Sequence, residues 1–510
     1  MNQPTSYQNP VIPGFHPDPS ICRVGRDYYL ATSSFEYFPG VPLFHSTDLV
    51  HFEPIGYALT RASQLPLEGV RSSHGIFAPT LRHHDGIFYL VTTNVTCGGN
   101  FYVTSSDPRG PWSEPVWLGE QQGIDPSLFF DDDGTVYYTR HGGGERGGVY
   151  QTLLDIGSGK LIGPPRLVWS GTGGRWPEGP HLYKRGGVYY LLISEGGTGY
   201  DHMLTVARSQ SPWGPFEAYA RNPVLTHRHR KGHPIQATGH GDWVQTSEGH
   251  DFVLFLGIRP PDGQHHHLGR ETFLAKLTWT DDGWPVIGND GTVELEMSTS
   301  GLPPRAPFDH PPPRDDFNRE ELLLCYNFVR NPSPGLFSLR ERPGFLRLYG
   351  QRASLDDIGS PAFVGRRQQH WVCRVSTLCD FNPTREHVEA GLVVRSNEQN
   401  HYDLVIALVD GRRAARLRVR TGGVTSFGAP CTLPDGPVEL RVRATPERYE
   451  FAVDSPGRGE RVLGSASTAA LSSEAAGGTF TGAYFGMFAG PSTGEHRVPA
   501  DFDWFDYVPG

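Results

Sequence analysis

The 510-residue sequence lacks any apolar run approaching the roughly 18 residues that a membrane-spanning helix needs. Its opening segment, residues 1–7, has neither the basic region nor the apolar region of a secretory signal. We therefore expect no membrane span and a cytoplasmic location. The length also exceeds what one hydrophobic core can serve, so two or three domains are expected.

Cysteine and basic charge are scarce as well. Only 6 cysteines occur, without the spacing of metal ligands or of a disulfide framework, so reduced and buried thiols are expected. The 45 basic residues are outnumbered by 55 acidic ones, which gives a formal net charge of −10. This balance argues against a nucleic-acid partner, because phosphate backbones are bound by basic patches.

Glycine (63), proline (44) and aromatic residues (12%) are abundant, a composition typical of β-strands joined by many turns. Aromatic-rich, strand-like runs recur at intervals of 49 to 63 residues, marked by Tyr28, Phe88, Tyr137, Tyr189 and Phe252. Each interval has room for about four short strands, the content of one propeller blade. The sequence therefore predicts an all-β chain that begins with a five-bladed β-propeller.

A second repeated layout lies ten to twelve residues before each marker, in residues 16–20, 77–81, 124–128, 177–181 and 239–243. The first strand of each propeller blade lines the central channel, so these segments are the predicted innermost strands. Asp18, Asp125, Glu178 and His240 are then expected to face one another in one funnel around the axis.

Proline density marks the end of the propeller pattern. Residues 301–314 predict a stiff, extended linker between a propeller of residues 1–300 and a second domain of residues 315–510. That domain alternates apolar and polar residues, as in 388–394 and 438–442, which predicts a two-sheet β-sandwich. It contains no visible catalytic constellation, so we expect an accessory role.

Three carboxylates in one funnel indicate a functional site, because buried like charges raise one another's pKa and cost stability. Glycoside hydrolysis requires two carboxyl groups on opposite sides of the scissile bond. Glu178, beside Trp176 and two prolines, suits the protonated acid, since desolvation raises a carboxyl pKa. Asp18, held between prolines, suits the base that positions a water. Asp125 is expected to orient Glu178 and to help keep it protonated.

Four segments resemble glycoside hydrolase family 43, in particular its two-domain β-xylosidases and α-L-arabinofuranosidases: residues 14–20, 33–41, 269–272 and 500–505. The resemblance runs through nearly the whole chain. It implies a five-bladed propeller, a jelly-roll, concanavalin-like sandwich and an exo-acting, inverting mechanism. It places the general base on Asp18, the pKa-modulating acid on Asp125 and the general acid on Glu178.

The resemblance also implies that Arg270 donates hydrogen bonds to the terminal sugar and that Phe35 packs against it. Both roles are physically sensible, since a guanidinium fork suits neighbouring hydroxyls and an aromatic face suits sugar C–H groups. Two substrate-side positions depart from the family's frequent residues. Phe77 stands where tryptophan is common, and His16 stands where asparagine is frequent. We expect these departures to affect the fit of xylose against arabinose rather than activity itself.

His240 has two interpretations that stay open, a hydrogen-bonded channel histidine that contacts substrate or a ligand of a divalent ion. The resemblance implies a Ca²⁺ ion on the propeller axis near such a histidine, held through water, although Ca²⁺ prefers oxygen ligands. No cofactor is expected for the chemistry itself. We interpret the histidine tract 264–267 as a solvated loop and the acidic run 131–134 as a hairpin turn.

The leading hypothesis is an enzyme that releases xylose from the non-reducing ends of β-1,4-xylo-oligosaccharides, with removal of terminal α-L-arabinofuranose as a second activity of the same site. A primarily arabinofuranose-cleaving enzyme is the alternative. A carbohydrate-binding propeller without turnover is the alternative from another class. The expected partners are an oligosaccharide substrate and, from the resemblance, further copies of the chain in a homodimer or homotetramer.

Overall fold

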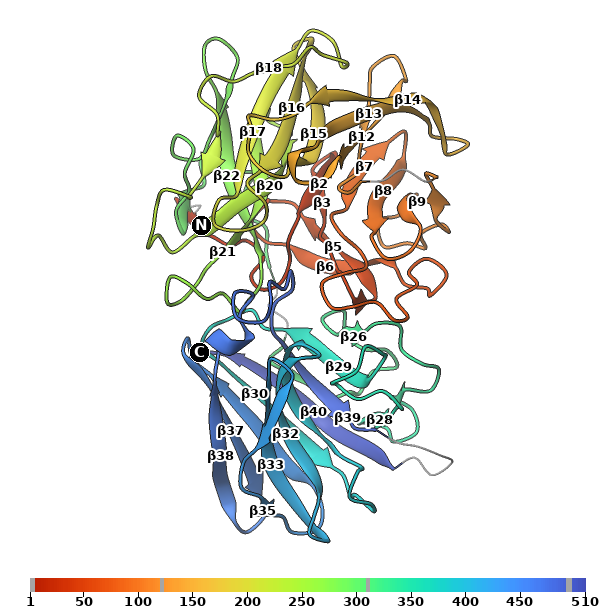
Figure 1. Cartoon of the computed structure of the whole chain (residues 1–510), viewed down its shortest axis with the longest axis vertical. Helices are drawn as coiled ribbons and strands as arrows, with labels where there is room; N and C mark the ends of the chain where they lie inside the picture. The colour runs from red at the N-terminus through yellow and green to blue at the C-terminus, as the bar shows by residue number, and fades with distance from the viewer. Residues whose placement is uncertain (1–4, 120–122, 309–311, 492–497) are drawn as a thin grey trace.

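The computed structural model describes residues 5–119, 123–308, 312–491 and 498–510. Within these residues there is no α-helix, and two 3-10 turns span Gly144–Arg146 (η1) and Ala469–Leu471 (η2). No helix in this part of the chain has the length and hydropathy to cross a bilayer. Figure 1 shows two stacked parts, with the red-to-green N-terminal part above the cyan-to-blue C-terminal part. The expected all-β class is confirmed.

The N-terminal part is a five-bladed propeller, as predicted, and each blade is one antiparallel sheet. The strands of a blade follow one another in the chain, except that β4 (Tyr37–Phe38) is not part of blade one. Blades one and two contain β2 (Ser20–Val24), β3 (Asp27–Ala31), β5 (Gly40–Ser46) and β6 (Glu53–Leu59), then β7 (Thr80–His84), β8 (Ile87–Asn94), β9 (Gly99–Ser105) and β10 (Val116–Trp117). Blade three contains β11 (Ser127–Phe130), β12 (Val136–Gly142), β13 (Gly148–Asp155) and β14 (Lys160–Trp169). Blades four and five contain β15 (Glu178–Arg185), β16 (Val188–Glu195), β17 (Met203–Ser209), β18 (Glu217–Ala218) and β19 (Leu225–Thr226), then β20 (Gln236–Gln245), β21 (Asp251–Ile258), β22 (Glu271–Trp279) and β23 (Pro285–Ile287).

The first strands of the five blades form a closed ring. β2 contacts β7, and the contacts continue from β7 to β11, from β11 to β15, from β15 to β20 and from β20 back to β2. The five aromatic markers all lie on the second strand of their blade. The acidic run 131–134 joins β11 to β12 as a hairpin turn, closed by an Asp131 N–H to Thr135 carbonyl bond of 2.9 Å. The sequence repeat therefore correctly predicted both the number of blades and which strand of each blade is innermost.

The C-terminal part is a sandwich of two antiparallel sheets. One sheet contains β25 (Arg314–Asp315), β27 (Phe337–Ser338), β28 (Leu346–Tyr349), β40 (Pro499–Pro509), β30 (Cys373–Asp380), β36 (Val438–Ala444), β37 (Arg448–Ser455) and β38 (Gly459–Ser467). The other contains β29 (Ala362–Arg367), β39 (Tyr484–Ala489), β31 (Ala390–Asn397), β32 (Asn400–Val409), β33 (Arg412–Thr421), β34 (Val424–Phe427) and β35 (Cys431–Thr432). Alternation along β36 buries Val438, Leu440 and Val442 between the sheets, because successive strand residues point to opposite faces.

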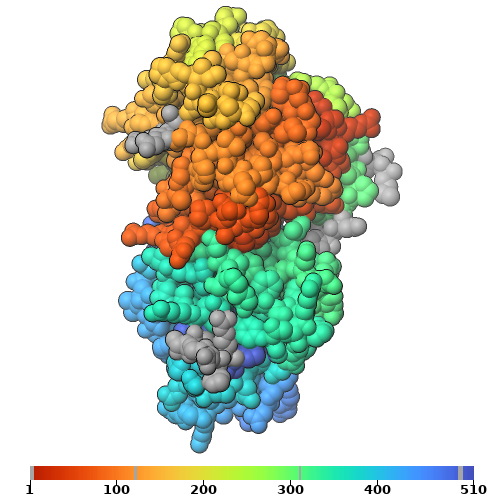
Figure 2. All heavy atoms as spheres, turned by 90° about the vertical axis from the view of Figure 1, so that its right-hand side faces the viewer, coloured from red at the N-terminus to blue at the C-terminus, as the bar shows by residue number. Residues whose placement is uncertain are grey.

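The two parts are joined by strand pairing as well as by the chain itself. β4 (Tyr37–Phe38) of the propeller pairs with β26 (Phe328–Val329) of the sandwich, and the Tyr37 ring stacks on the Tyr484 ring at 4.0 Å. β1 (Ser6–Gln8) pairs with β24 (Glu296–Ser298) and fastens the N-terminal segment to the propeller. Figure 2 shows the two parts in contact along a broad junction. Part of the predicted linker, residues 309–311, lies outside the described residues.

Candidate active site

Three of the four predicted funnel residues have left-handed backbone at the innermost strands. Asp18 (φ 55°) precedes β2, Asp125 (φ 54°) precedes β11 and His240 (φ 45°) lies in β20. Glu178 is the first residue of β15. A left-handed conformation costs a non-glycine residue about 1–3 kcal/mol and persists only where the surrounding structure imposes it. The inner strands thus impose a strained backbone where these side chains meet.

Asp18 is buried and is held by neighbours that favour its ionised form. Its Oδ2 accepts the Ser33 hydroxyl at 2.5 Å, and its Oδ1 accepts Arg270 Nη1–H at 2.9 Å. His240 Nδ1 lies 3.5 Å from the same Oδ1. Burial alone raises the pKa of Asp18, but Arg270, His240 and the Ser33 hydrogen bond together hold that pKa below its usual value. Asp18 is therefore a carboxylate at neutral pH.

Asp125 and Glu178 are in the opposite situation. Burial raises the pKa of Asp125, and the charge of Asp18 adds to this, although His240 opposes it. Burial also raises the pKa of Glu178 well above its usual value, and the charges of Asp125 and Asp18 raise it further. The pKa values of Asp18 and Glu178 are therefore moved in opposite directions within one funnel, the condition for paired acid and base chemistry.

The predicted sugar-binding residues lie beside Asp18. Arg270 is buried, donates a second bond from Nη1 to the Thr198 hydroxyl at 3.0 Å, and lies 5.5 Å from the Phe35 ring centroid. The ring of Phe77 lies 5.3 Å from that of Phe35. These side chains form an aromatic wall around a guanidinium that already contacts the carboxylate.

Comparison with known proteins identifies the family. A model of the glycosyl hydrolases family 43 matches residues 7–285, and a model of the beta xylosidase C-terminal concanavalin A-like domain matches residues 314–508. The chain belongs to glycosyl hydrolase family 43. It is therefore a glycoside hydrolase with a concanavalin-like second domain, and the chemistry of family 43 needs no cofactor.

Three related proteins resemble the chain over almost its full length. The non-reducing end alpha-L-arabinofuranosidase BoGH43B of Bacteroides ovatus is 45% identical, over 98% of this chain and 94% of that protein. A xylosidase/arabinosidase of Butyrivibrio fibrisolvens is 40% identical, over 98% of both chains. The crystal structure of a xylan beta-1,4-xylosidase from Bacillus halodurans superposes with a TM-score of 0.94 at 38% identity, covering 98% of this chain and 100% of that one.

The family 43 site of this chain includes a sandwich residue that sequence reasoning missed. Phe480 lies on residues 472–483, the loop between η2 and β39, which we call the sandwich loop. Its carbonyl accepts Arg270 Nη2–H at 3.3 Å, and its ring lies 5.8 Å from Phe35 and 5.9 Å from Phe77. No repeat or motif marks this residue, because its partners are in the other domain. Phe480 closes the side of the funnel that faces the sandwich.

The interpretation of residues 264–267 as a solvated loop is wrong for two of its histidines. His266 Nδ1 lies 2.7 Å from Glu474 Oε1 on the sandwich loop. His267 is buried, which lowers its pKa to about 3, and its carbonyl accepts the Ala483 N–H at 2.8 Å. The tract docks the sandwich loop against the propeller, so it was the distant partner, and not local polarity, that decided its environment.

The propeller axis below the funnel is filled by protein groups. Asp242 Oδ2 accepts Arg82 Nη1–H at 2.7 Å and the Ser20 hydroxyl at 2.7 Å, while Oδ1 accepts the Tyr183 hydroxyl at 2.5 Å. Arg82 Nη2 lies 2.9 Å from His181 Nδ1. Both oxygens of the axial carboxylate are therefore engaged, and the residues here do not fit a directly coordinated Ca²⁺, which needs 6–8 oxygen ligands. Among the described residues no group of three or more His, Cys, Asp or Glu side chains is arranged to hold a metal ion.

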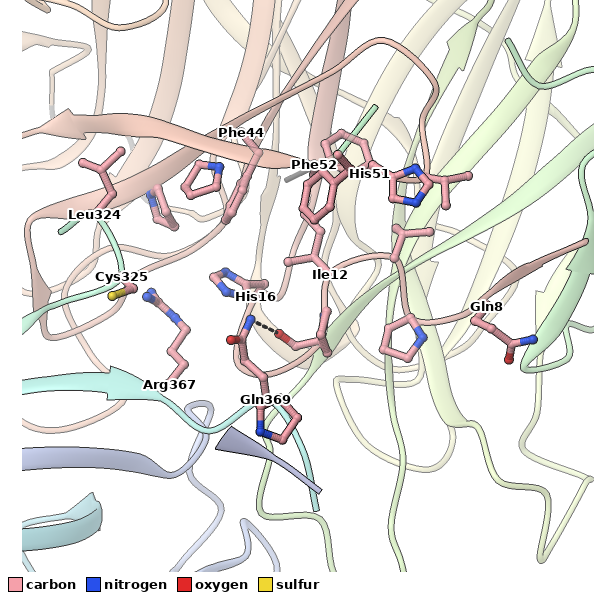
Figure 3. Close-up of a pocket in the computed structure, with 18 of the residues that line it drawn as sticks. Gln8, Ile12, His16, Phe44, His51, Phe52, Leu324, Cys325, Arg367 and Gln369 are labelled. Atoms are coloured by element: carbon pink, nitrogen blue, oxygen red, sulfur yellow. Dashed lines mark hydrogen bonds between the residues drawn. The ribbon is translucent and has the colours of Figure 1, made fainter. Parts of the chain in front are cut away.

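A cavity of about 1240 Å³ lies between the domains, but it is lined by none of the three funnel carboxylates. Figure 3 shows His16 in its wall, with Phe44 from the propeller and Leu324, Arg367 and Gln369 from the sandwich. The His16 ring contacts Phe44 edge-on at 5.1 Å. The expectation that His16 affects the fit of the sugar is therefore unsupported by its position, whereas Phe77 lies in the funnel wall.

Proposed function

We propose that the chain removes single terminal pentoses from the non-reducing ends of oligosaccharides, with inversion at the anomeric carbon. β-1,4-Linked xylose is the leading substrate, and terminal α-L-arabinofuranose is the second. The observation that carries this proposal is the contrast within one funnel between Asp18, whose pKa the bonded Arg270 helps to hold below its usual value, and Glu178, whose pKa burial and two like charges raise well above it. Inverting glycosidases use one carboxylate as base and one carboxylic acid as proton donor.

In the proposed reaction Asp18 removes a proton from a water as that water attacks the anomeric carbon. Glu178 delivers its proton to the oxygen of the leaving sugar, so the glycosidic bond breaks as the new C–O bond forms. Asp125 keeps Glu178 protonated by its like charge and, through the Gly179 N–H that it accepts at 3.0 Å, fixes the backbone next to that acid. The buried Nε–H of Arg270 has no protein partner within the described residues and is the donor we assign to a sugar hydroxyl.

Release of one terminal unit at a time is supported by the shape of the funnel wall. Phe480 of the sandwich and the propeller aromatics Phe35 and Phe77 enclose one side of the site beside Arg270. A polysaccharide running through the site would have to displace the sandwich loop. The arabinofuranose activity is favoured by the 45% identical relative, which is named for it.

Three further expectations remain proposals. We infer a cytoplasmic location and a homodimer or homotetramer. A Ca²⁺ ion near His240 would have to be held through water, since the axial carboxylate is already engaged by Arg82 and its neighbours. The His240 ring atom Nδ1 lies 3.5 Å from Asp18 Oδ1, which favours its interpretation as a channel histidine.

Incubation with aryl β-xyloside and aryl α-L-arabinofuranoside tests the function. We expect turnover of both, and proton NMR of the first product from a β-xyloside should show α-xylose. Formation of β-xylose would contradict the role of Asp18 as the base that activates water. Tight binding of xylo-oligosaccharides without turnover of either substrate would instead favour the carbohydrate-binding propeller.

A further inference from the structure

A chain of hydrogen bonds runs from a buried acid at the domain junction to Asp18. Glu36 Oε2 accepts the Ser73 N–H at 2.9 Å, and Ser73 Oγ accepts the Phe480 N–H at 2.9 Å. The Phe480 carbonyl accepts Arg270 Nη2–H at 3.3 Å, and Arg270 Nη1–H reaches Asp18 at 2.9 Å. The chain crosses from propeller to sandwich and back within four bonds.

Ser73 has a strained backbone conformation and is buried at the junction between the two domains. Its backbone is left-handed (φ 66°), and its side chain is buried at the junction. Glu36 is fully buried, and burial raises its pKa, while Arg395 and Arg330 of the sandwich lower it. The segment that carries Ser73 is also fixed to Phe35 by paired backbone bonds between Phe35 and Ile76 of 2.9 and 3.2 Å. The hydrogen bond that the Ser73 Oγ makes is the one it accepts from the Phe480 N–H of the sandwich.

We propose that Ser73 is a positioning residue through which the propeller holds Phe480, and with it Arg270 and Asp18, in working geometry, with Glu36 orienting Ser73. This inference rests on the proposed role of Asp18 as base. Ser73 touches no reacting atom, so it acts through the sandwich loop. The accessory domain thereby becomes part of the catalytic machinery, because the link to Arg270 passes through the backbone of Phe480.

The neighbouring Ser72 supplies the control. Its hydroxyl donates to Glu398 Oε2 at 2.5 Å and lies 3.4 Å from Arg395 Nη2, so it also joins the two domains. It makes no hydrogen bond to the sandwich loop in the described structure. Ser72→Ala therefore weakens the same junction without breaking the connection to Phe480.

The test compares Ser73→Gly with Ser72→Ala in the full-length enzyme. Glycine adopts a positive φ without strain, so Ser73→Gly removes the acceptor while relieving the backbone. We expect Ser73→Gly to keep the melting temperature but to lose roughly 10-fold in kcat/KM on aryl β-xyloside, because a small misplacement of reacting groups is costly. Ser72→Ala should stay within about 2-fold of wild type. Ser73→Ala, which keeps the Cβ, should reproduce the loss.

The pH profile separates positioning from a general loss of structure. The charged and titratable groups that face Asp18 are Arg270, His240, His202, Asp125 and Glu178. When Phe480 is released, Arg270 is held less firmly on Asp18, so the acidic limb of kcat/KM should move to higher pH by up to about one unit. An unchanged limb with kcat/KM near the wild-type value, or an equal loss in Ser72→Ala, would overturn the inference. An inactive wild type would contradict the proposed function instead.

Discussion

Carboxylates in the funnel and carboxylates on the outer face of the sandwich have opposite surroundings. On the solvent-facing side of β36–β38, Glu439, Glu450 and Glu460 each lie 2.5–2.8 Å from an arginine guanidinium. In the funnel, Asp18 is paired with Arg270. Burial raises the pKa of Asp125 and of Glu178, the charge of Asp18 raises both further, and the charge of Asp125 also raises that of Glu178. The sandwich carboxylates are each paired with an arginine, whereas in the funnel one arginine-paired carboxylate lies beside two carboxyl groups that no salt bridge to a Lys or Arg among the described residues neutralises.

The contrast shows what each region contributes. Paired charges on an exposed sheet face stay ionised and add modest stability, which suits a structural surface. Crowded buried carboxyls separate their pKa values, and that separation makes one group a base and another an acid. It costs stability, because buried like charges repel, so such crowding is kept where chemistry requires it. Removing a carboxyl group from the funnel should therefore chiefly change activity, whereas removing one from the sandwich face should chiefly change stability.

The largest effect is expected where the funnel loses its proton donor. Glu178→Gln keeps the shape but cannot give a proton to the leaving oxygen, so kcat on xylobiose should fall roughly 10³-fold. Aryl xylosides with good leaving groups should be less affected, since they need less protonation, and binding should be retained. Steady-state kinetics on both substrates measure this, with Glu460→Gln as the matched exchange in the sandwich. Unchanged turnover of xylobiose would rule out Glu178 as the acid.

A smaller effect is expected when the like charge beside the acid is removed. Asp125→Asn takes away a negative charge that raises the pKa of Glu178, so that pKa should fall. The basic limb of the kcat/KM profile should then move to lower pH, with roughly a 10- to 100-fold loss at neutral pH. Asp133→Asn, an exposed carboxylate of the same blade, is the control and should leave the profile unchanged. A basic limb that stays in place would contradict the modulating role of Asp125.

The propeller was predictable because its signals are local and repeated. The markers Tyr28, Phe88 and Tyr137 recur as strand patterns with turns between them, and each blade buries its own aromatic strand. The recurrence also placed Asp18, Asp125 and Glu178 on the inner ring, since the position of a residue within its blade fixes its distance from the axis. Periodicity alone carried this information.

Contacts between the domains could not be predicted in that way. Phe480 has no marking motif, and its place beside Arg270 depends on how a sandwich loop docks on a distant strand end. His267 looked solvated because its neighbours in sequence are polar, yet the sandwich loop buries it. Ser73, which bonds to Glu36, has a left-handed backbone although it is not a glycine, so its residue type does not reveal this conformation. These contacts depend on how the surfaces of the two domains dock, and no single segment of the sequence specifies them.

The smallest effect should appear in stability against pH, where the two regions should differ in sign. The pKa of Glu460 is lowered by its bonds to Arg443 and Arg441, so its contribution is present above the unfolded pKa of about 4.3 and lost as pH falls through the folded pKa. Glu460→Gln should therefore cost about 0.5–1 kcal/mol at pH 7 and less at pH 3.

The pKa of Glu178 is raised, so its contribution is present below the unfolded pKa and lost as pH rises through the folded pKa. Wild type should thus lose melting temperature relative to Glu178→Gln as pH rises from the unfolded pKa of about 4.3 through the raised folded pKa, while it gains relative to Glu460→Gln as pH rises from 3 to 7. Thermal melts of the three proteins across this range measure both slopes. If the melting temperatures of the two variants changed in parallel with pH, the pKa values of Glu178 and Glu460 would shift in the same direction on folding. That result would contradict the raised pKa on which the role of Glu178 as acid depends.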